Sequence, residues 1–494
     1  MTSLTDTAAS NSLKTAALDP AANAAFITEA RALLGPKGFS QEPQDVAPWL
    51  TDWRGRYTGK AFALASPAST QEVSALVKLC AHHRVPIVPQ GGNSGMAGGA
   101  TPDASGQSIL LSLRRMNTIR ALDSGAAQAV CEAGVILQTF HEAADEAGMR
   151  FPLTLGGKGS ATIGGLVSTN AGGTQVLRHG TMRAQVLGIE AVLADGQVFD
   201  SLTALKKDNR GFDLKQLMIG SEGTLGIVTA ATLRLLPAQR GRATAWVGLP
   251  SITDARTLLR QMERLLGDAL EGFEVVPAHC LDSVLAHLPG ARAPLQQRHE
   301  WNALIELASA NSDDSALRVT LEEALVDAAQ DGLEIDAIIA ANDRQSEDLW
   351  HLRDSISEAE RAIGPAMQHD ISVPVERMPE FILEASPAIE TAFPGTRAAA
   401  FGHLGDGNVH FHILAPKGAV PGEWEEGEGK VISSRVYDFV TQWGGSISAE
   451  HGIGQMKVGE LGRLGDPTAL AMMRAVKQAL DPHGLLNPGK LVPD

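Results

Sequence analysis

The chain has 494 residues, enough for two or three domains with substantial cores. Hydrophobic residues make up 44% of the sequence and charged residues 20%, and no apolar run is long enough to cross a membrane, so we expect a soluble protein. The net charge of −16 argues against nucleic acid or an anionic lipid surface as the main partner.

The cysteines and the N-terminal segment indicate the compartment. Cys80, Cys131 and Cys280 are too few and too scattered for a disulfide framework or a thiolate metal site, which predicts a reducing compartment. Residues 1–25 lack the apolar core of a secretory signal and the arginines of a mitochondrial transit peptide. We therefore expect a cytoplasmic protein, with residues 1–55 forming an N-terminal helical lead-in.

The first predicted elements alternate between helix and strand. Helical spacing over residues 23–34 predicts a helix that stops at Gly35-Pro36. A strand at 62–65 precedes a helix that begins at the capping box Ser69–Glu72 and runs through His82. The next strand, at 85–88, leads directly into a glycine-rich loop, as in a βαβ unit that carries a ligand-binding loop.

Two glycine-rich segments, 89–100 and 155–173, lie in this part of the chain. Such loops can turn backbone N–H groups toward an anion because no Cβ atom blocks the approach. One loop alone could be a tight turn, whereas two suit a long cofactor that contains a pyrophosphate. Neither contains GxGxxG, so a nicotinamide dinucleotide is not supported.

Further elements complete the first half and begin a second. Strands at 108–113 and 127–131, a helix at 137–147 and a hairpin at 186–200 come first, and Gly220–Thr229 could approach a flat ring or form a buried strand with a glycine bend. After Leu236-Pro237 the helices lengthen, which predicts a separate α+β domain to about residue 416. The helices expected in this half and the tail are 252–266, 313–329, 349–362, 430–443 and 466–480.

A histidine-rich hairpin is predicted around Asp406-Gly407. A two-residue turn there places His403 opposite His410 with Cβ atoms about 4.5 to 5.5 Å apart, and His412 follows on the same face. The rings could share one metal ion or one substrate, although a plain turn is the alternative. Glu450-His451 could add a carboxylate and an imidazole, and two His with one Glu form a known catalytic zinc set.

These motifs resemble the FAD-dependent D-2-hydroxyacid dehydrogenases of the vanillyl-alcohol-oxidase type. That family includes hydroxyglutarate and D-lactate dehydrogenases and the FAD subunit of glycolate oxidase, and the resemblance is strongest to the hydroxyglutarate branch. The match runs from about Trp49 to the C-terminus. It is carried by Pro89–Gly99, Phe151–Gly173, Lys207–Asn209, Asp213–Gln216, Gly220–Ile227, His403–His410, Glu450–Gly454 and Asn487–Lys490.

The resemblance implies an α+β fold. A two-part PCMH-type FAD-binding domain would span 56–238, an α+β substrate or cap domain with an antiparallel sheet and a metal site would span 239–455, and a helical segment at 456–494 would close on the flavin. The FAD would be held without a covalent bond. Its expected contacts are Pro89, Gln90, Gly91, Gly92, Asn93, Ser94, Gly95, Gly156, Ser160, Gly164, Gly165, Thr169, Asn170, Gly172, Gly173, Glu222, Gly223, Ile227 and Asn487.

The resemblance also implies a reaction. A D-2-hydroxyacid such as D-2-hydroxyglutarate, D-lactate or D-malate would be oxidised to the 2-oxoacid, with hydride passing to flavin N5. His403, His410 and Glu450 would bind a divalent metal, with zinc the expected ion, and His451 would act as general base and contact the substrate. The other expected substrate contacts are Arg353, which would clamp a carboxylate, Ser357 one helical turn on, Gln368 and His412.

Two residues depart from the hydroxyglutarate pattern. Gln368 stands where a lysine is usual, and His412 stands where an asparagine is usual. A neutral amide cannot supply a charged hydrogen bond, typically worth about 1.5 to 3 kcal/mol, so the sequence leaves the five-carbon diacid open to question.

The remaining expectations concern partners and rival functions. No iron–sulfur or haem motif is present, so electrons would leave to a separate acceptor such as an electron-transfer flavoprotein, a quinone or a cytochrome. The resemblance suggests a homodimer. A flavin-bearing electron-transfer subunit without substrate turnover and a metal-dependent hydrolase are the alternative functions.

Overall fold

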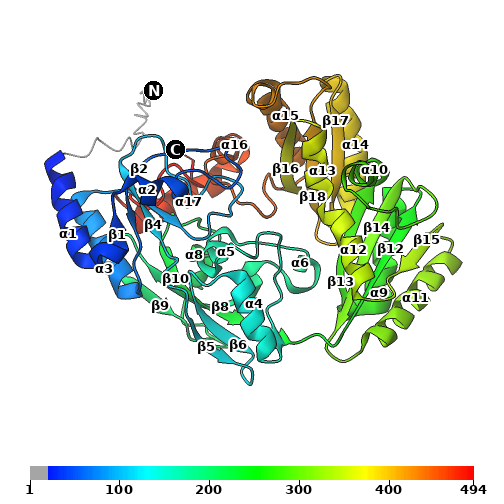
Figure 1. Cartoon of the computed structure of the whole chain (residues 1–494), viewed down its shortest axis with the longest axis horizontal. Coiled ribbons are helices and arrows are strands. Elements are labelled where there is room, and N and C mark those ends of the chain that lie inside the picture. Colours follow the sequence, from blue (N-terminus) through cyan, green and yellow to red (C-terminus); the bar gives the residue numbers. More distant parts are fainter. Residues whose placement is uncertain (1–19, 494) are drawn as a thin grey trace, which may run out of the picture.

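The structure is a computed structural model, and it describes residues 20–493. The first 19 residues of the predicted lead-in lie outside this range. The described chain forms two α+β halves that lie side by side (Figure 1). The predicted fold class, with a large antiparallel sheet in the second half, is confirmed.

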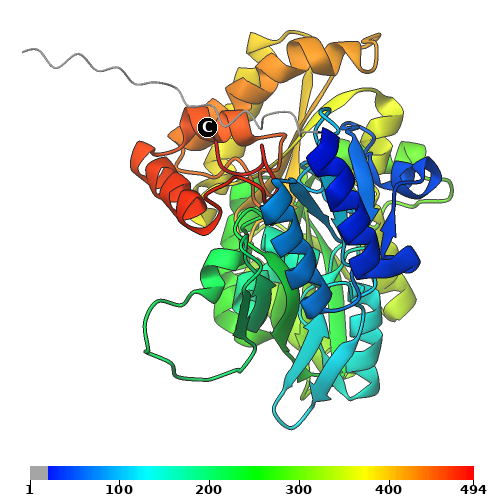
Figure 2. The same cartoon turned by 90° about the vertical axis from the view of Figure 1, so that its left-hand side faces the viewer.

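The first half begins with a small sheet covered by two helices. The strand order is β1-β2-β4-β3, and β2 and β3 both run parallel to β4 because α3 supplies the crossover. Figure 2 shows α1 and α3 (blue) packed side by side against this sheet. Gly35 has a φ of 66° and interrupts α1 at the predicted stop. The elements are α1 (Pro20–Gly38), β1 (Phe39–Ser40), α2 (Pro43–Val46), β2 (Ala61–Ala65), α3 (Thr70–His83), β3 (Ile87–Gln90) and β4 (Ser108–Ser112).

A second, antiparallel sheet completes the first half, with the strand order β5-β6-β10-β8-β9. The predicted hairpin is confirmed, and five residues around Gly196 join β8 to β9. Strand β5 was not predicted. The elements are β5 (Ile119–Asp123), β6 (Gln128–Glu132), α4 (Leu137–Glu146), β7 (Met149–Arg150), α5 (Ile163–Thr169), α6 (Val176–His179), α7 (Met182–Gln185), β8 (Val186–Val192), β9 (Val198–Ser201), α8 (Lys215–Met218), β10 (Ile227–Arg234) and β11 (Leu236–Pro237).

The second half is a seven-stranded sheet with the order β15-β12-β14-β13-β17-β18-β16. One face packs on α9, α11, α14 and α15, and the other packs on α10, α12 and α13. The strands are β12 (Gly241–Leu249), β13 (Leu270–Pro277), β14 (Trp301–Ser309), β15 (Asp336–Ile339), β16 (Ala366–Ser372), β17 (Arg397–His403) and β18 (Asn408–Leu414). The helices are α9 (Ile252–Leu266), α10 (Ala278–His287), α11 (Asp314–Gln330), α12 (Asp343–Asp354), α13 (Ile356–Ile363), α14 (Met378–Ala392) and α15 (Lys430–Gln442).

The predicted single helix over 349–362 is wrong. Helix α12 ends at Asp354 and α13 begins at Ile356, because Ser355 has a ψ of −4° that breaks the regular helix between them. Arg353 therefore lies at the end of one helix and Ser357 at the start of the next.

The C-terminal segment returns to the first half. After α16 (Val458–Leu464) and α17 (Pro467–Leu480), the Asn487 N–H donates to the Ile87 carbonyl and the Ile87 N–H donates to the Leu485 carbonyl, both at 2.8 Å. Figures 1 and 2 both show this segment (red) beside the N-terminal helices. Within residues 20–493, no helix is both long and apolar enough to cross a bilayer.

Candidate functional site

A cavity of about 690 Å³ lies in the first half, within the volume range of small-molecule sites. Both glycine-rich segments form its walls, together with the start of β10 and the segment that carries His451. The residues expected at the cofactor that line it are Pro89, Gln90, Gly91, Gly92, Asn93, Ser94, Gly95, Gly156, Ser160, Gly164, Gly165, Thr169, Gly172, Glu222, Gly223 and Ile227.

Some glycines of this cavity allow close packing of the two loops, and others leave open space. A Cβ atom on Gly92 would lie 1.7 Å from the Ser160 carbonyl oxygen, so the two loops touch through backbone. Gly95 and Gly156 line the cavity and have nothing within 4 Å of an added Cβ. The loops thus form a cradle that an elongated ligand can enter.

Three residues expected at the cofactor support the walls instead of lining them. The Asn487 side-chain amide donates to the carbonyls of Gly99 and Glu222, at 2.9 and 2.8 Å. The Asn170 side chain accepts from the Arg183 N–H, and a Cβ on Gly173 would meet backbone at 2.1 Å.

Several residues around the cradle have left-handed backbone. The φ angles of Asn93, Asn170, Glu222 and Asn487 are 54°, 50°, 52° and 44°. Such conformations cost about 1 to 3 kcal/mol each for residues other than glycine and gather at functional sites. The Glu222 carboxylate also accepts the N–H groups of Ile453 and Gly454, both at 2.7 Å, and so ties the C-terminal segment to the cradle.

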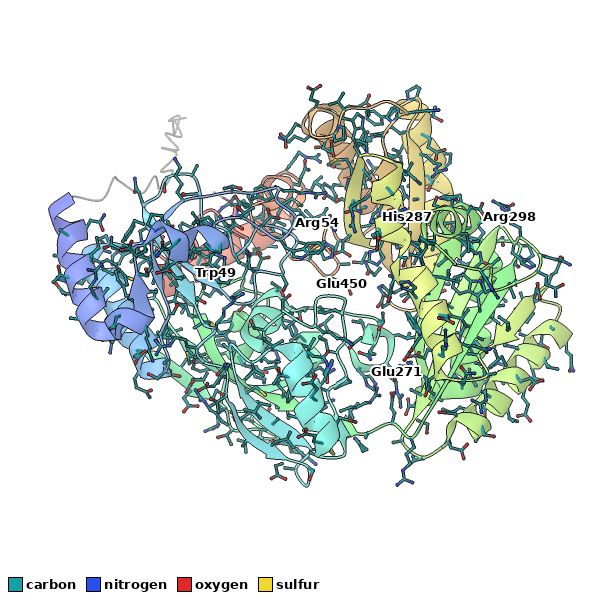
Figure 3. The ribbon with its side chains drawn as sticks, viewed as in Figure 1. Trp49, Arg54, Glu271, His287, Arg298 and Glu450 are labelled. Atoms are coloured by element: carbon teal, nitrogen blue, oxygen red, sulfur yellow. The ribbon has the colours of Figure 1, made fainter. Side chains whose placement is uncertain are left out.

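A second, polar cavity of about 150 Å³ adjoins the first. Met96 and His451 line both cavities, so the two meet at these side chains. Figure 3 shows Arg54 and Glu450 at this junction between the two halves of the molecule. All the residues expected at the substrate line the small cavity, namely Arg353, Ser357, Gln368, His412 and His451.

The predicted register of the histidine hairpin is wrong. His403 pairs with Asn408, and His410 pairs with Phe401, which leaves a four-residue loop. A two-residue type I′ turn needs positive φ at both central residues, and Gly407 has it while Asp406 does not. The buried Leu404 also leaves the hairpin, because its N–H donates to the Phe273 carbonyl on β13.

The histidine rings nevertheless gather on one face of the sheet. His403 and His410 are diagonal neighbours with ring centroids 5.4 Å apart, and His412 lies 6.2 Å beyond His410. A diagonal pair on one face of a sheet is close enough for such side chains to meet. The predicted clustering of these three histidines is therefore confirmed despite the register error.

His403 belongs to a buried charge chain. Its Nδ1 lies 2.5 Å from Glu274 Oε1, and Arg353 donates to Glu274 Oε2 at 2.8 Å. Burial alone would lower the pKa of His403, but the Glu274 carboxylate raises it to about 9. Burial alone would raise the pKa of Glu274, but Arg353 and His403 hold it far below its usual range. Glu274 thus orients His403 and neutralises Arg353.

Asp370 organises the other side of the cluster. Its Oδ2 accepts the backbone N–H groups of Glu450 and His451 at 2.8 and 3.0 Å, and its Oδ1 accepts from the Asn408 side chain at 2.9 Å. His410 Nδ1 lies 4.0 Å away. Burial raises the pKa of Glu450, and Asp370 raises it further, to about 7. Burial lowers the pKa of His451 to about 4, against the opposing pull of Asp370.

The cluster offers oxygen and nitrogen atoms suited to a divalent cation. Across the described residues, one group of three potential ligands lies with its atoms within 4.8 Å of one another, and it consists of Asp370, Glu450 and His451. The set expected from the resemblance, His403, His410 and Glu450, shares only Glu450 with this group. The Asp370 oxygens already accept three hydrogen bonds, which favours a supporting role for this carboxylate.

Sequence reasoning assigned no role to Glu274, Asp370 or Arg54. Glu274 lies in an apolar strand, where a fully buried carboxylate signals a specific partner. Asp370 pairs with His410 across β16 and β18, which only the strand order reveals. Arg54 precedes the first sheet and carries no motif.

The FAD binding domain family matches residues 62–201, and the family of FAD linked oxidases, C-terminal domain, matches residues 238–491. The chain belongs to the FAD-linked oxidase family. Since the large cavity of this FAD-linked oxidase is built mainly from the segment matched by the FAD binding domain, its cofactor is FAD.

Curated relatives of this FAD-linked oxidase match along most of their length. D-2-hydroxyglutarate dehydrogenase of Xanthomonas citri pv. viticola is 36% identical over 452 residues, which cover 91% of this chain and 93% of that protein. The mitochondrial D-2-hydroxyglutarate dehydrogenase of Arabidopsis thaliana is 37% identical over 461 residues, covering 93% of this chain and 80% of that protein.

Solved structures share the fold. A p-cresol methylhydroxylase with substrate bound superposes with a TM-score of 0.74 at 16% identity, covering 97% of this chain and 98% of that chain. An alkyldihydroxyacetonephosphate synthase gives a TM-score of 0.70 at 16% identity, covering 94% of this chain and 84% of that chain. At this level of identity the likeness shows the fold alone.

Proposed function

We propose that this protein is an FAD-dependent dehydrogenase that oxidises a D-2-hydroxy acid to the 2-oxo acid and passes the electrons to a separate acceptor. The observation that carries the proposal is the meeting of the two cavities at His451. A substrate bound in the small polar cavity would lie next to the large cavity, here called the flavin cavity. The His451 imidazole lies between the two cavities. The names of the curated relatives support the same chemistry.

Arg353 and His451 would have separate roles in this reaction, in substrate binding and in proton transfer. The Arg353 guanidinium lines the polar cavity and can hold a substrate carboxylate, while Glu274 fixes its orientation. His451 Nδ1 lies 3.6 Å from Asp370 Oδ2, which leaves Nε2 to accept the hydroxyl proton. FAD, when bound, supplies the hydride acceptor for the hydrogen on C2.

A divalent metal, with zinc the proposed ion, belongs to the same proposal. His403, His410 and Glu450 would hold it, and it would make the substrate hydroxyl more acidic. The pairing of His403 Nδ1 with Glu274 supports this, since metal-binding imidazoles commonly direct their second ring nitrogen to a carboxylate. Asp370 would support His410 and the Glu450 backbone.

Anaerobic reduction of the flavin tests the proposal. The purified holoenzyme is mixed with D- and L-enantiomers of 2-hydroxyglutarate, malate, lactate and 2-hydroxybutyrate, and the oxidised flavin band is followed. We expect D-acids to bleach the band and L-acids to leave it unchanged. If dithionite reduces the flavin but no D-acid does, the proposed dehydrogenase activity is wrong and an electron-transfer subunit becomes the better description.

A further inference from the structure

The polar cavity contains a second guanidinium, and it comes from the other half of the molecule. Arg54 lies before β2 in the first half of the molecule, here called the FAD-binding half. It nevertheless lines the cavity together with Arg353, Ser357 and His412 of the second half, here called the cap half. Its Nη1 donates to Gln368 Oε1 at 2.5 Å, across 314 residues of sequence. Figure 3 shows Arg54 projecting into the junction near Glu450.

The two arginines of the cavity differ in how their charge is balanced. Arg353 is paired with the fully buried Glu274 carboxylate. In the part of the chain that the structure describes, no carboxylate oxygen lies within 4.0 Å of the Arg54 guanidinium, whose only hydrogen-bond acceptor is the neutral Gln368 amide. Arg54 is thus the cation of this cavity whose charge is left for a ligand to balance.

Buried donors around Arg54 also lack partners. Arg54 Nε and Gln368 Nε2 are both buried without a hydrogen bond in the structure. Leaving such groups unpaired costs about 1 to 3 kcal/mol each, and more for charged groups. One carboxylate placed beside them could accept from both.

The electrostatic surroundings of Arg54 also favour an anion. Burial, followed by the charges of Arg56 and Arg361, lowers the pKa of Arg54 to about 10, against the opposing effect of Asp52. Three guanidinium groups therefore raise the local potential, and the guanidinium fork suits a carboxylate geometrically.

We propose that Arg54 binds a second carboxylate of the substrate, so that the enzyme prefers D-2-hydroxy acids that carry a carboxylate at each end. This inference rests on the proposed function. In such a complex Arg353 and Arg54 hold opposite ends of one molecule, and the substrate links the cap half to the FAD-binding half. The neutral Gln368 orients the guanidinium through its hydrogen bond.

Variants of Arg54 test this specificity. Arg54→Met removes the charge, Arg54→Lys keeps it, and Lys60→Gln removes an exposed charge of the same segment that lines neither cavity, as a control. The second-order rate constant of flavin reduction is measured for two-carboxylate acids (D-2-hydroxyglutarate, D-malate) and one-carboxylate acids (D-lactate, D-2-hydroxybutyrate). Arg54→Met should lower it about 10- to 100-fold for the first class and less than about threefold for the second, with Arg54→Lys in between and Lys60→Gln near wild type.

Calorimetric binding of 2-oxoglutarate and 2-oxobutyrate to the oxidised holoenzyme gives a readout that needs no turnover. Arg54→Met should weaken 2-oxoglutarate binding about 10-fold or more and leave 2-oxobutyrate binding unchanged. Equal losses for both classes, or a wild-type enzyme without preference for two carboxylates, would overturn the inference. In the latter case the dehydrogenase proposal stands if D-lactate still reduces the flavin, so the two failures are distinct.

Discussion

Asp370 and Glu274 are the two buried carboxylates that surround the histidine cluster, and they act on different partners. Glu274 pairs with the side chain of His403, whereas Asp370 accepts hydrogen bonds from the backbone N–H groups of Glu450 and His451. By accepting these two N–H groups, the Asp370 carboxylate positions the Glu450 and His451 side chains and takes no direct part in the reaction.

The metal assignment gives a prediction at the residue scale. We expect the purified protein to contain about one divalent ion per flavin, and His403→Ala to lose both the ion and the activity, because a ligand is removed. Metal analysis by mass spectrometry together with flavin absorbance measures the ratio. His287→Ala serves as the control, since His287 on α10 pairs with Glu358 on α13 and does not line either cavity.

The alternative ligand set makes the opposite prediction. If the ion is lost in Asp370→Asn but survives in His403→Ala, the ligands are Asp370, Glu450 and His451, and the set inferred from the resemblance is wrong. A metal-free enzyme with full activity would rule out both sets.

At the scale of elements, the glycine loops show how closely backbone segments approach around the flavin cavity. The Gly92 segment touches the Ser160 segment through backbone atoms, which links the loop after β3 to the segment before α5. The loops lie next to rigid strands and helices, so a shift in one moves the wall of the cofactor site.

Gly92→Ala should therefore disrupt the cradle. Its Cβ would lie 1.7 Å from a backbone carbonyl that cannot move aside as a flexible side chain could. We expect a lower flavin-to-protein absorbance ratio and an unfolding free energy lower by about 1 to 3 kcal/mol or more. Gly459→Ala is the matched control, because it lies in α16 with nothing within 4 Å and should gain helix propensity. Full flavin content in Gly92→Ala would contradict the expectation.

Local sequence patterns predicted some of these elements correctly and others wrongly. The capping box at Ser69 and the alternating apolar positions predicted α3 and its flanking strands, because these depend on neighbouring residues. The hairpin at Asp406-Gly407 took a longer loop, because a bond from Leu404 to β13 outweighed the local turn preference. The helix over 349–362 broke at Ser355 without any breaker residue in the sequence.

At the scale of the whole molecule, Glu271 joins the two halves. This residue of β13 accepts hydrogen bonds from Arg150 at 2.6 Å and Arg178 at 2.8 Å, and His179 lies 3.4 Å away, all three from the FAD-binding half. Figure 3 shows Glu271 at the junction, apart from Arg54 and Glu450. This cluster is a second connection between the halves, independent of the active site.

The Glu271 cluster predicts a pH-dependent stability. Burial alone would raise the pKa of Glu271, but His179 and Arg150 hold it well below its usual range. A lowered pKa stabilises the fold above the unfolded-state pKa of about 4.3, and this contribution is lost as the pH falls further. Glu271→Gln should cost about 3 to 5 kcal/mol at pH 7, and its difference from wild type should shrink below about pH 4.

Unfolding midpoints measured from pH 8 to pH 3 check this dependence. Glu300→Gln is the control, since Glu300 forms an exposed pair with Arg298 and should change stability by less than about 0.5 kcal/mol. A wild-type advantage over Glu271→Gln that stays constant down to pH 3 would show that the carboxylate charge does not contribute.

The amino-acid sequence alone was enough to predict the two glycine-rich loops, the α+β order of elements, and the clustering of His403, His410 and His412, because these follow from residue type and short spacing. Three contacts became visible only in the folded chain: Glu274 orients His403, Asp370 accepts the N–H groups of Glu450 and His451, and Arg54 donates to Gln368. The physical reason is that each of these contacts joins segments 80 to 314 residues apart, through strand order and domain packing that local periodicity does not encode.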